Sequence, residues 1–206
     1  MIPLMNNETN NTIAALPESR FTRFRKSFWG EIIQIVIVSL LIVIPFRIYI
    51  AQPFIVSGTS MDDTFANGQY LIVDELTYRL SEPQRGDVLI LRPPNNLSVY
   101  YIKRLIGLPG ETVEIKNDVV TVTNKENPKG FILKEPYVKI DKTFPPRPAY
   151  TVTLKADEYL VFGDNRLVSQ DSRIFGPIKR EEIAGRPIFR LWPLSKINYL
   201  PGENRY

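Results

Sequence analysis

One long apolar segment near the amino terminus limits what this chain can fold into more than any other feature. From Phe28 to Ile50 the sequence is almost free of charge, with Glu31 near one end and Arg47 near the other. The charge-free run, 32–46, is about 15 residues, whereas a helix needs roughly 20 to cross a bilayer. Long side chains at the ends can reach the membrane interface. We therefore predict a single transmembrane helix over residues 28–50.

Two other interpretations of this segment are a cleavable signal sequence and a buried core helix. The polar leader of residues 1–27 and the lack of a small-x-small cleavage pattern argue against a signal sequence. A β-rich remainder would not easily enclose a helix that is apolar on all sides. Phe28, Trp29 and Tyr49 stand where interfacial aromatic residues are expected.

The distribution of positive charge predicts the orientation of this helix. A basic cluster precedes the helix, whereas Arg47 is the one basic residue close to its other end. The charges of the long domain that follows have little influence on orientation. We expect residues 1–27 to be a cytoplasmic tail and residues 51–206 to be extracytoplasmic, in a plasma or thylakoid membrane. Lipid, rather than nucleic acid, is the expected partner of the basic cluster, which comprises Arg20, Arg23, Arg25 and Lys26.

Composition narrows the chemistry that the 206 residues can perform. A hydrophobic content of 44% can build a core in one domain with appendages. The chain has no cysteine and no histidine, which excludes disulfides, thiolate catalysis and cysteine or histidine metal sites. No calcium-loop spacing is present, so we expect neither a metal nor a cofactor.

After residue 51 the pattern changes to short strands separated by turns. We predict a mainly β fold, an all-β barrel or sandwich, because helical periodicity is weak and proline and glycine cluster between the apolar segments. Asn117-Asp118 predicts a tight hairpin, and 126–150 reads as an insertion or lid-like loop. The predicted strands are 69–75, 87–92, 98–106, 112–116, 119–123, 158–162 and 188–192.

Ser60 and Lys103 are the candidate reactive pair. A serine nucleophile needs a base, and without histidine that base cannot be imidazole. Lysine can serve if burial lowers its pKa from about 10.4 by several units. Lys103 lies in an apolar strand that fits this requirement.

Ordinary structural roles are open for both residues: a turn serine, and a strand lysine whose amine reaches water. Strand alternation places Lys103 and Arg104 on opposite faces. One would then point to the core and the other to a surface or partner.

Several segments together closely resemble the boxes of type I signal peptidases, in that family's order and behind the expected membrane anchor. They are Arg47 with 52–61 (Gln-Pro-Phe-Ile-Val-Ser-Gly-Thr-Ser-Met), 101–111 (Tyr-Ile-Lys-Arg-Leu-Ile-Gly-Leu-Pro-Gly-Glu), 163–173 (Gly-Asp-Asn-Arg-Leu-Val-Ser-Gln-Asp-Ser-Arg) and 185–193. The resemblance implies a membrane-bound serine endopeptidase that removes signal peptides from exported preproteins.

The resemblance also implies a role for each matching residue. Ser60 would be the nucleophile and Lys103 the general base. Ser169 would hydrogen-bond and orient the lysine, while Asp171 and Arg173 would form a supporting ion pair. Residues 164–166 would be architectural, building the loop that presents Ser169.

The substrate would bind as an extended strand between the segments that precede Ser60 and Lys103. Apolar side chains there would line shallow pockets for small residues, although core packing is the alternative for each. These candidates are Phe54, Val56, Met61, Tyr101 and Ile102. Gly58 belongs to the same region; many family members have serine there as an oxyanion donor, so backbone donors or Ser57 would serve instead.

One departure concerns the residues after the nucleophile, where the family usually has Met-x-Pro-Thr and this chain has Met61-Asp62-Asp63-Thr64. A carboxylate facing the site would raise the pKa of Lys103, the wrong direction for a base, whereas a solvent-facing one would have little effect. The first rival hypothesis is therefore a catalytically impaired paralogue that binds exported chains. The second, a self-cleaving repressor peptidase, would need a DNA-binding helix-turn-helix where this chain has the apolar segment.

Overall fold

The computed structural model describes residues 28–49, 51–138 and 148–204. The chain divides into two compact units, residues 1–44 and 45–206. The predicted cytoplasmic tail, 1–27, lies outside the described residues together with its basic cluster. Residues 139–147 of the predicted insertion lie outside them as well.

Helix α2 (Phe28–Tyr49) occupies the predicted apolar segment. Its described isoleucine, leucine and valine side chains, between Ile32 and Ile44, are exposed. Among the helices in the described part of the chain, none meets the combined length and hydropathy that a membrane crossing requires. The transmembrane span and its orientation stay predictions.

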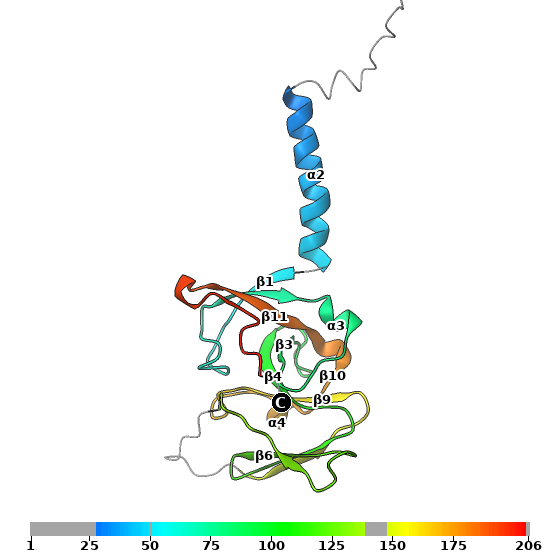
Figure 1. The fold of residues 1–206 in the computed structure, drawn as a ribbon, viewed down its shortest axis with the longest axis vertical. Coiled ribbons are helices and arrows are strands. Elements are labelled where there is room, and N and C mark those ends of the chain that lie inside the picture. Colours follow the sequence, from blue (N-terminus) through cyan, green and yellow to red (C-terminus); the bar gives the residue numbers. More distant parts are fainter. Residues whose placement is uncertain (1–27, 50, 139–147, 205–206) are drawn as a thin grey trace, which may run out of the picture. The chain divides into compact units, whose positions relative to one another are not determined.

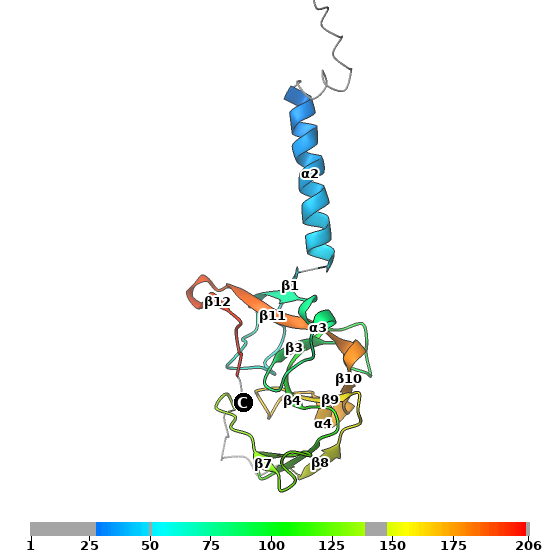
Figure 2. The same ribbon diagram turned by 45° about the vertical axis from the view of Figure 1, so that its right-hand side comes forward.

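The rest of the described chain is built on two antiparallel sheets, which confirms the mainly β prediction (Figures 1 and 2). The larger, eight-stranded sheet has the order β1-β2-β11-β3-β4-β9-β10, with β12 paired to β11. Its strands are β1 (Ala51–Ile55), β2 (Tyr70–Asp74), β11 (Ile183–Trp192), β3 (Val88–Leu91), β4 (Tyr101–Gly107), β9 (Glu158–Phe162), β10 (Ile178–Lys179) and β12 (Asn198–Tyr199).

The smaller, four-stranded sheet has the order β7-β6-β5-β8. In both views it lies beyond β4 and β9, on the side away from β1 and β2 (Figures 1 and 2). Its strands are β5 (Thr112–Lys116), β6 (Val119–Thr123), β7 (Phe131–Ile132) and β8 (Tyr150–Thr153). Short helical turns complete the elements: α3 (Thr77–Leu80), α4 (Ser172–Phe175), η1 (Arg180–Glu182) and η2 (Leu194–Lys196).

The β5–β6 hairpin confirms its sequence signal. Buried and exposed residues alternate along both strands, as expected when one face of a sheet is covered. Asn117 and Asp118 have φ values of 52° and 61°, and these two residue types tolerate the left-handed region that such a turn needs.

The segment after β6 is more ordered than a lid-like loop. Strand β7 pairs with β6, and the Leu133 N–H donates to the Val120 carbonyl at 2.9 Å. The Leu133 side chain is buried among Ile106, Phe162 and their apolar neighbours. Phe131 and Leu133 thus belong to the core that joins the two sheets.

Strand β4 is buried on both faces, because it lies between this shared core and the apolar clusters of the larger sheet. Its last residue, Gly107, comes so close to the smaller sheet that an added Cβ would lie 2.8 Å from Leu154 Cδ1 and from Val113 Cγ2. The close packing of the two sheets therefore needs glycine at this position.

We predict that Gly107→Ala lowers the free energy of unfolding by about 1–3 kcal/mol, because the new methyl group overpacks the shared core. Urea unfolding of the two proteins measures the change. The double variant Gly107→Ala/Leu154→Ala should lose less than the sum of the two single variants, because truncation of Leu154 makes room for the new methyl group. A Gly107→Ala protein as stable as the parent would contradict the close approach.

Candidate active site

Ser60 lies in a tight turn between β1 and β2. The Asp62 N–H donates to the Thr59 carbonyl, and the Phe65 N–H donates to the Met61 carbonyl. The side chains of Met61 and Phe65 anchor this turn in the core. The Ser60 carbonyl also accepts the Asn165 N–H at 3.0 Å, so the turn is tied to the 163–173 segment.

Lys103 meets Ser60 in the interior. The Lys103 side chain leaves β4 on the face toward the turn, and its Nζ lies 2.8 Å from Ser60 Oγ and 3.0 Å from the Ile102 carbonyl oxygen. The residue is 3% exposed. Burial lowers the pKa of Lys103 to about 8, against the opposing charges of Asp171 and Asp164. Loss of water around the amine is therefore the dominant influence on its charge.

Arg104 does not point to a surface or partner, as one reading of strand alternation suggested. It is 1% exposed, and its Nε and Nη2 donate to the two oxygens of Asp164 at 2.8 and 2.6 Å. Its Nη1 donates to the carbonyls of Gly86 and Gly202. Because β4 is covered on both faces, Arg104 is buried as Lys103 is. A buried guanidinium needs a carboxylate partner, which Asp164 supplies.

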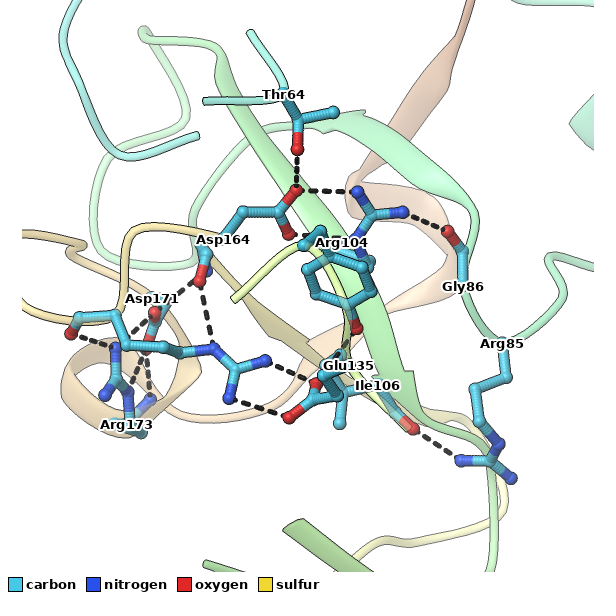
Figure 3. Close-up of polar contacts among 12 residues, drawn as sticks. Thr64, Arg85, Gly86, Arg104, Ile106, Glu135, Asp164, Asp171 and Arg173 are labelled. Carbon is cyan, nitrogen blue, oxygen red and sulfur yellow. Dashed lines mark hydrogen bonds and ion pairs between the residues drawn. The ribbon is translucent and has the colours of Figure 1, made fainter. Parts of the chain in front are cut away.

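Asp164 connects the arginine to the nucleophile turn. Its Oδ2 accepts the Thr64 hydroxyl at 2.6 Å, and Figure 3 shows the carboxylate between Thr64 and Arg104. The Asp164 N–H donates to Met61 Sδ at 3.4 Å. These contacts agree with the architectural role predicted for residues 164–166.

The predicted ion pair of Asp171 and Arg173 is formed (Figure 3). Arg173 Nε and Nη2 donate to the Asp171 carboxylate at 2.8 and 2.7 Å, and the Gly163 N–H donates to the same group at 3.0 Å. Burial favours a raised pKa for Asp171, but the Arg173 hydrogen bonds and charge and the Gly163 N–H outweigh it and lower the pKa. Asp171 is thus held as a carboxylate beneath the site.

Ser169 lies beside the Asp171–Arg173 pair, and no hydrogen bond from its hydroxyl to Lys103 is seen among the described residues. Its Oγ is near enough to Asp171 to lower that carboxyl's pKa, yet it is buried without a regular hydrogen-bond partner among the described residues. A Cβ added at Gly163 would lie 2.2 Å from Ser169 Oγ and 2.4 Å from the Ser60 carbonyl oxygen. Ser169 therefore adjoins the Ser60 turn, and its orienting role stays a prediction.

A cleft of about 360 Å³ opens beside Ser60 and Lys103. Of the predicted substrate-binding residues, Phe54, Val56, Gly58, Tyr101 and Ile102 line it. Met61 does not, because its side chain is 1% exposed and packs in the core. Ser57, a candidate oxyanion donor, lines it too. The remaining lining residues, which the sequence did not single out, are Ile55, Thr59, Leu71, Ile90, Tyr100, Val168 and Gln170.

Some of these missed residues carry a signal in the sequence. Leu71 and Ile90 are apolar residues of predicted strands, and Val168 and Gln170 alternate with Ser169 in the 163–173 segment. Tyr100 stacks edge-to-face on Phe54, with ring centroids 5.1 Å apart. That aromatic contact joins two segments far apart in the chain, so no local pattern indicates it.

The sequence departs from the family pattern at Asp63, after the nucleophile, and at Gly58, before it. Asp63 is exposed, and the carboxylates that raise the pKa of Lys103 are Asp171 and Asp164. The Gly58 N–H donates to Asn67 Oδ1 at 2.9 Å, so that donor is already used. The exposed position of Asp63 removes the main reason for expecting an impaired site.

A serine hydroxyl within hydrogen-bond reach of a buried amine, at the wall of a cleft, is the arrangement that a serine hydrolase with a lysine base requires. Comparison with known proteins identifies the family of the chain as one of peptidases. Residues 29–192 match the family described as "Signal peptidase, peptidase S26". The chain belongs to this family.

Individual relatives agree with the family. The chain is 34% identical over 177 residues to "Signal peptidase I P" of Bacillus subtilis subsp. natto, covering 82% of this chain and 90% of the relative. It is 31% identical over 180 residues to "Probable signal peptidase I-2" of a Synechocystis species, covering 85% and 78%. A crystal structure of a signal peptidase I from Enterococcus faecalis aligns with 33% identity and a TM-score of 0.44, covering 52% of this chain and 97% of that one.

We predict that Lys103→Met raises the free energy of unfolding at pH 7 by about 1–3 kcal/mol, because an apolar side chain replaces a buried ammonium. The folded state holds the Lys103 proton less tightly than the unfolded state does, so the ammonium destabilises the fold below pH 8. The difference should shrink between pH 8 and 10.5, the folded and ordinary pKa values. Urea unfolding at several pH values measures it.

The matched control is Lys116→Met, which changes an exposed lysine of β5. It should leave the free energy of unfolding almost unchanged at every pH. A Lys103→Met protein less stable than the parent at pH 7 would contradict the desolvation argument.

Proposed function

We propose that this chain is a membrane-bound serine endopeptidase that removes signal peptides from exported preproteins, with Ser60 as nucleophile and Lys103 as general base. Family membership supports the activity. The observation that carries the residue roles is the 2.8 Å contact between Lys103 Nζ and Ser60 Oγ at the cleft. The impaired-paralogue alternative is not favoured, since this contact is intact and Asp63 is exposed.

The reaction is an acyl transfer in two stages. Ser60 Oγ attacks the scissile carbonyl carbon while its proton passes to the neutral Lys103 Nζ. The tetrahedral intermediate collapses to an ester on Ser60, and Lys103 gives that proton to the leaving amine of the mature chain. Water then attacks the ester with Lys103 again accepting a proton, which returns to Ser60 Oγ as the signal peptide leaves. The new carboxyl group of the signal peptide releases its proton to solvent.

The substrate would lie along the cleft as an extended strand. Strand β1 ends the order of the larger sheet as described, and an edge strand offers backbone groups for such pairing. Phe54, Val56, Tyr101 and Ile102 supply the apolar wall. We propose that this wall accepts small side chains before the cut.

Residues 28–50 are the proposed membrane anchor, with residues 1–27 in the cytoplasm and 51–206 on the other side of a plasma or thylakoid membrane. The apolar sequence of α2 and the basic cluster before it support this topology. Anchoring would hold the peptidase domain at the surface where signal peptides emerge.

We expect Ser60→Ala and Lys103→Arg each to lower cleavage of a model preprotein by about 10³-fold or more. Alanine has no nucleophile, and arginine keeps the charge but cannot be deprotonated in a protein. Cleavage of a preprotein by the purified full chain in detergent is the measurement. Ser98→Ala and Lys116→Arg, on an exposed loop and an exposed strand face, are the matched controls. Retained turnover by Lys103→Arg would rule out the lysine as base.

The rate should depend on the protonation of Lys103. We expect kcat/KM to rise with pH and to level off above an apparent pKa of about 8, because the protonated amine cannot accept the Ser60 proton. Initial rates of peptide cleavage between about pH 6 and 10 measure this profile. A flat profile across that range would show that the base is not a group with the pKa of Lys103.

A further inference from the structure

We propose that Glu135 and Tyr137 are positioning residues for the reaction. From the segment that follows β7, they hold the two buried arginines that fix the base-bearing strand and the nucleophile turn. The inference rests on the proposed function, because it concerns the same Ser60 and Lys103 site. The two residues follow β7, in the segment that the sequence suggested to be a lid-like loop.

Glu135 holds Arg166 through an ion pair with two hydrogen bonds. Arg166 Nη1 donates to Glu135 Oε2 at 3.1 Å, and Nη2 donates to Oε1. The two side chains are 4% and 8% exposed. Such a buried pair is strongly destabilised when one partner alone is removed, so Glu135 is required wherever Arg166 is kept.

Arg166 in turn holds the backbone that contacts the nucleophile. Its Nε donates to the Gly163 carbonyl at 3.1 Å, and its carbonyl accepts Arg173 Nη2 at 3.0 Å. Asn165, which directly precedes Arg166, donates its N–H to the Ser60 carbonyl. A shift of the Arg166 guanidinium would thus move the loop on which Ser60 rests.

Tyr137 acts on the other arginine. The Arg104 Cζ lies 3.9 Å from the centroid of the Tyr137 ring, a cation–π contact. The Tyr137 hydroxyl donates to Glu135 Oε1 at 2.9 Å. Arg104 is next to Lys103 in β4 and donates to Asp164. Tyr137 therefore contacts the arginine that holds the strand bearing the base.

Glu135 also balances the charge of this buried network. Three arginines, Arg104, Arg166 and Arg173, pair with Asp164, Glu135 and Asp171 respectively. Figure 3 shows Glu135 on the opposite side of Arg104 and Asp164 from Thr64. The segment that follows β7 therefore supplies one of the three carboxylates, together with the aromatic ring that lies over Arg104.

Neither Glu135 nor Tyr137 lines the substrate cleft. Their loss should therefore change the geometry of the reacting groups rather than substrate binding. Displacement of a catalytic group by about 1 Å can lower the rate by about 100-fold. A fall in kcat at constant KM is the expected signature.

The experiment compares Glu135→Gln, Tyr137→Leu and Tyr137→Phe in the purified full chain, with kcat and KM for a model preprotein and with thermal unfolding measured in parallel. We expect Glu135→Gln and Tyr137→Leu to lower kcat by about 10- to 100-fold, with KM nearly unchanged. Tyr137→Phe keeps the ring over Arg104 and should keep most of kcat. Glu114→Gln, an exposed carboxylate of β5, is the matched control and should behave as the parent.

A double variant, Glu135→Leu/Arg166→Met, separates positioning from stability. It replaces both charges with apolar groups, which often preserves folding, and its kcat should still fall. Folded variants with the kcat of Glu114→Gln would overturn the proposal, as would a rise in KM at unchanged kcat. A parent protein that does not cleave the preprotein would instead contradict the proposed function, so the two failures are distinguishable.

Discussion

The separation of two adjacent cations on one buried strand is the constraint on which the site depends. Both Lys103 and Arg104 are removed from water, but they meet opposite surroundings. Arg104 faces a carboxylate and two carbonyls, which keep its charge. Lys103 faces a hydroxyl and one carbonyl, so burial favours the neutral amine. Alternation along β4 thus places a base and a permanent charge side by side in the chain but on different faces.

This arrangement explains why the site needs two sheets. An amine is desolvated only where strands and turns cover it, and the core shared by β4, β9 and the smaller sheet covers one face of β4. The nucleophile turn, with its apolar side chains Met61 and Phe65, covers another part of β4. The buried ion pairs join these layers, so that the hydroxyl and the amine belong to one rigid arrangement rather than to two independent loops.

Much of this fold could be predicted from the sequence, because the signals are local. Alternation in 112–116 and 119–123 and the Asn-Asp turn between them gave the hairpin with its bounds. Strand β1 was not predicted, since Pro53 is a poor strand residue and the segment adjoins the apolar run. Strand β4 begins at Tyr101 rather than at residue 98 because the chain makes turns between Pro93 and Val99.

The site was predictable where a residue type determines the chemistry. Without histidine, Ser60 needed a lysine, and the structure places Lys103 beside it. The partners of Arg104 and Arg166 were not predictable, because Asp164 and Glu135 lie far from them in sequence. Met61 was assigned to the cleft because it follows the nucleophile, whereas the turn directs its side chain into the core.

Gly163 shows that such a site is defined by space as well as by functional groups. Its α-carbon fits between the Ser60 carbonyl and the Ser169 side chain, where a methyl group has no room. A saturation scan that ranks positions by lost turnover would therefore rank 163 beside 60 and 103, although glycine has no side chain that could react. Maps of that kind identify the residues that must stay small together with those that do the chemistry.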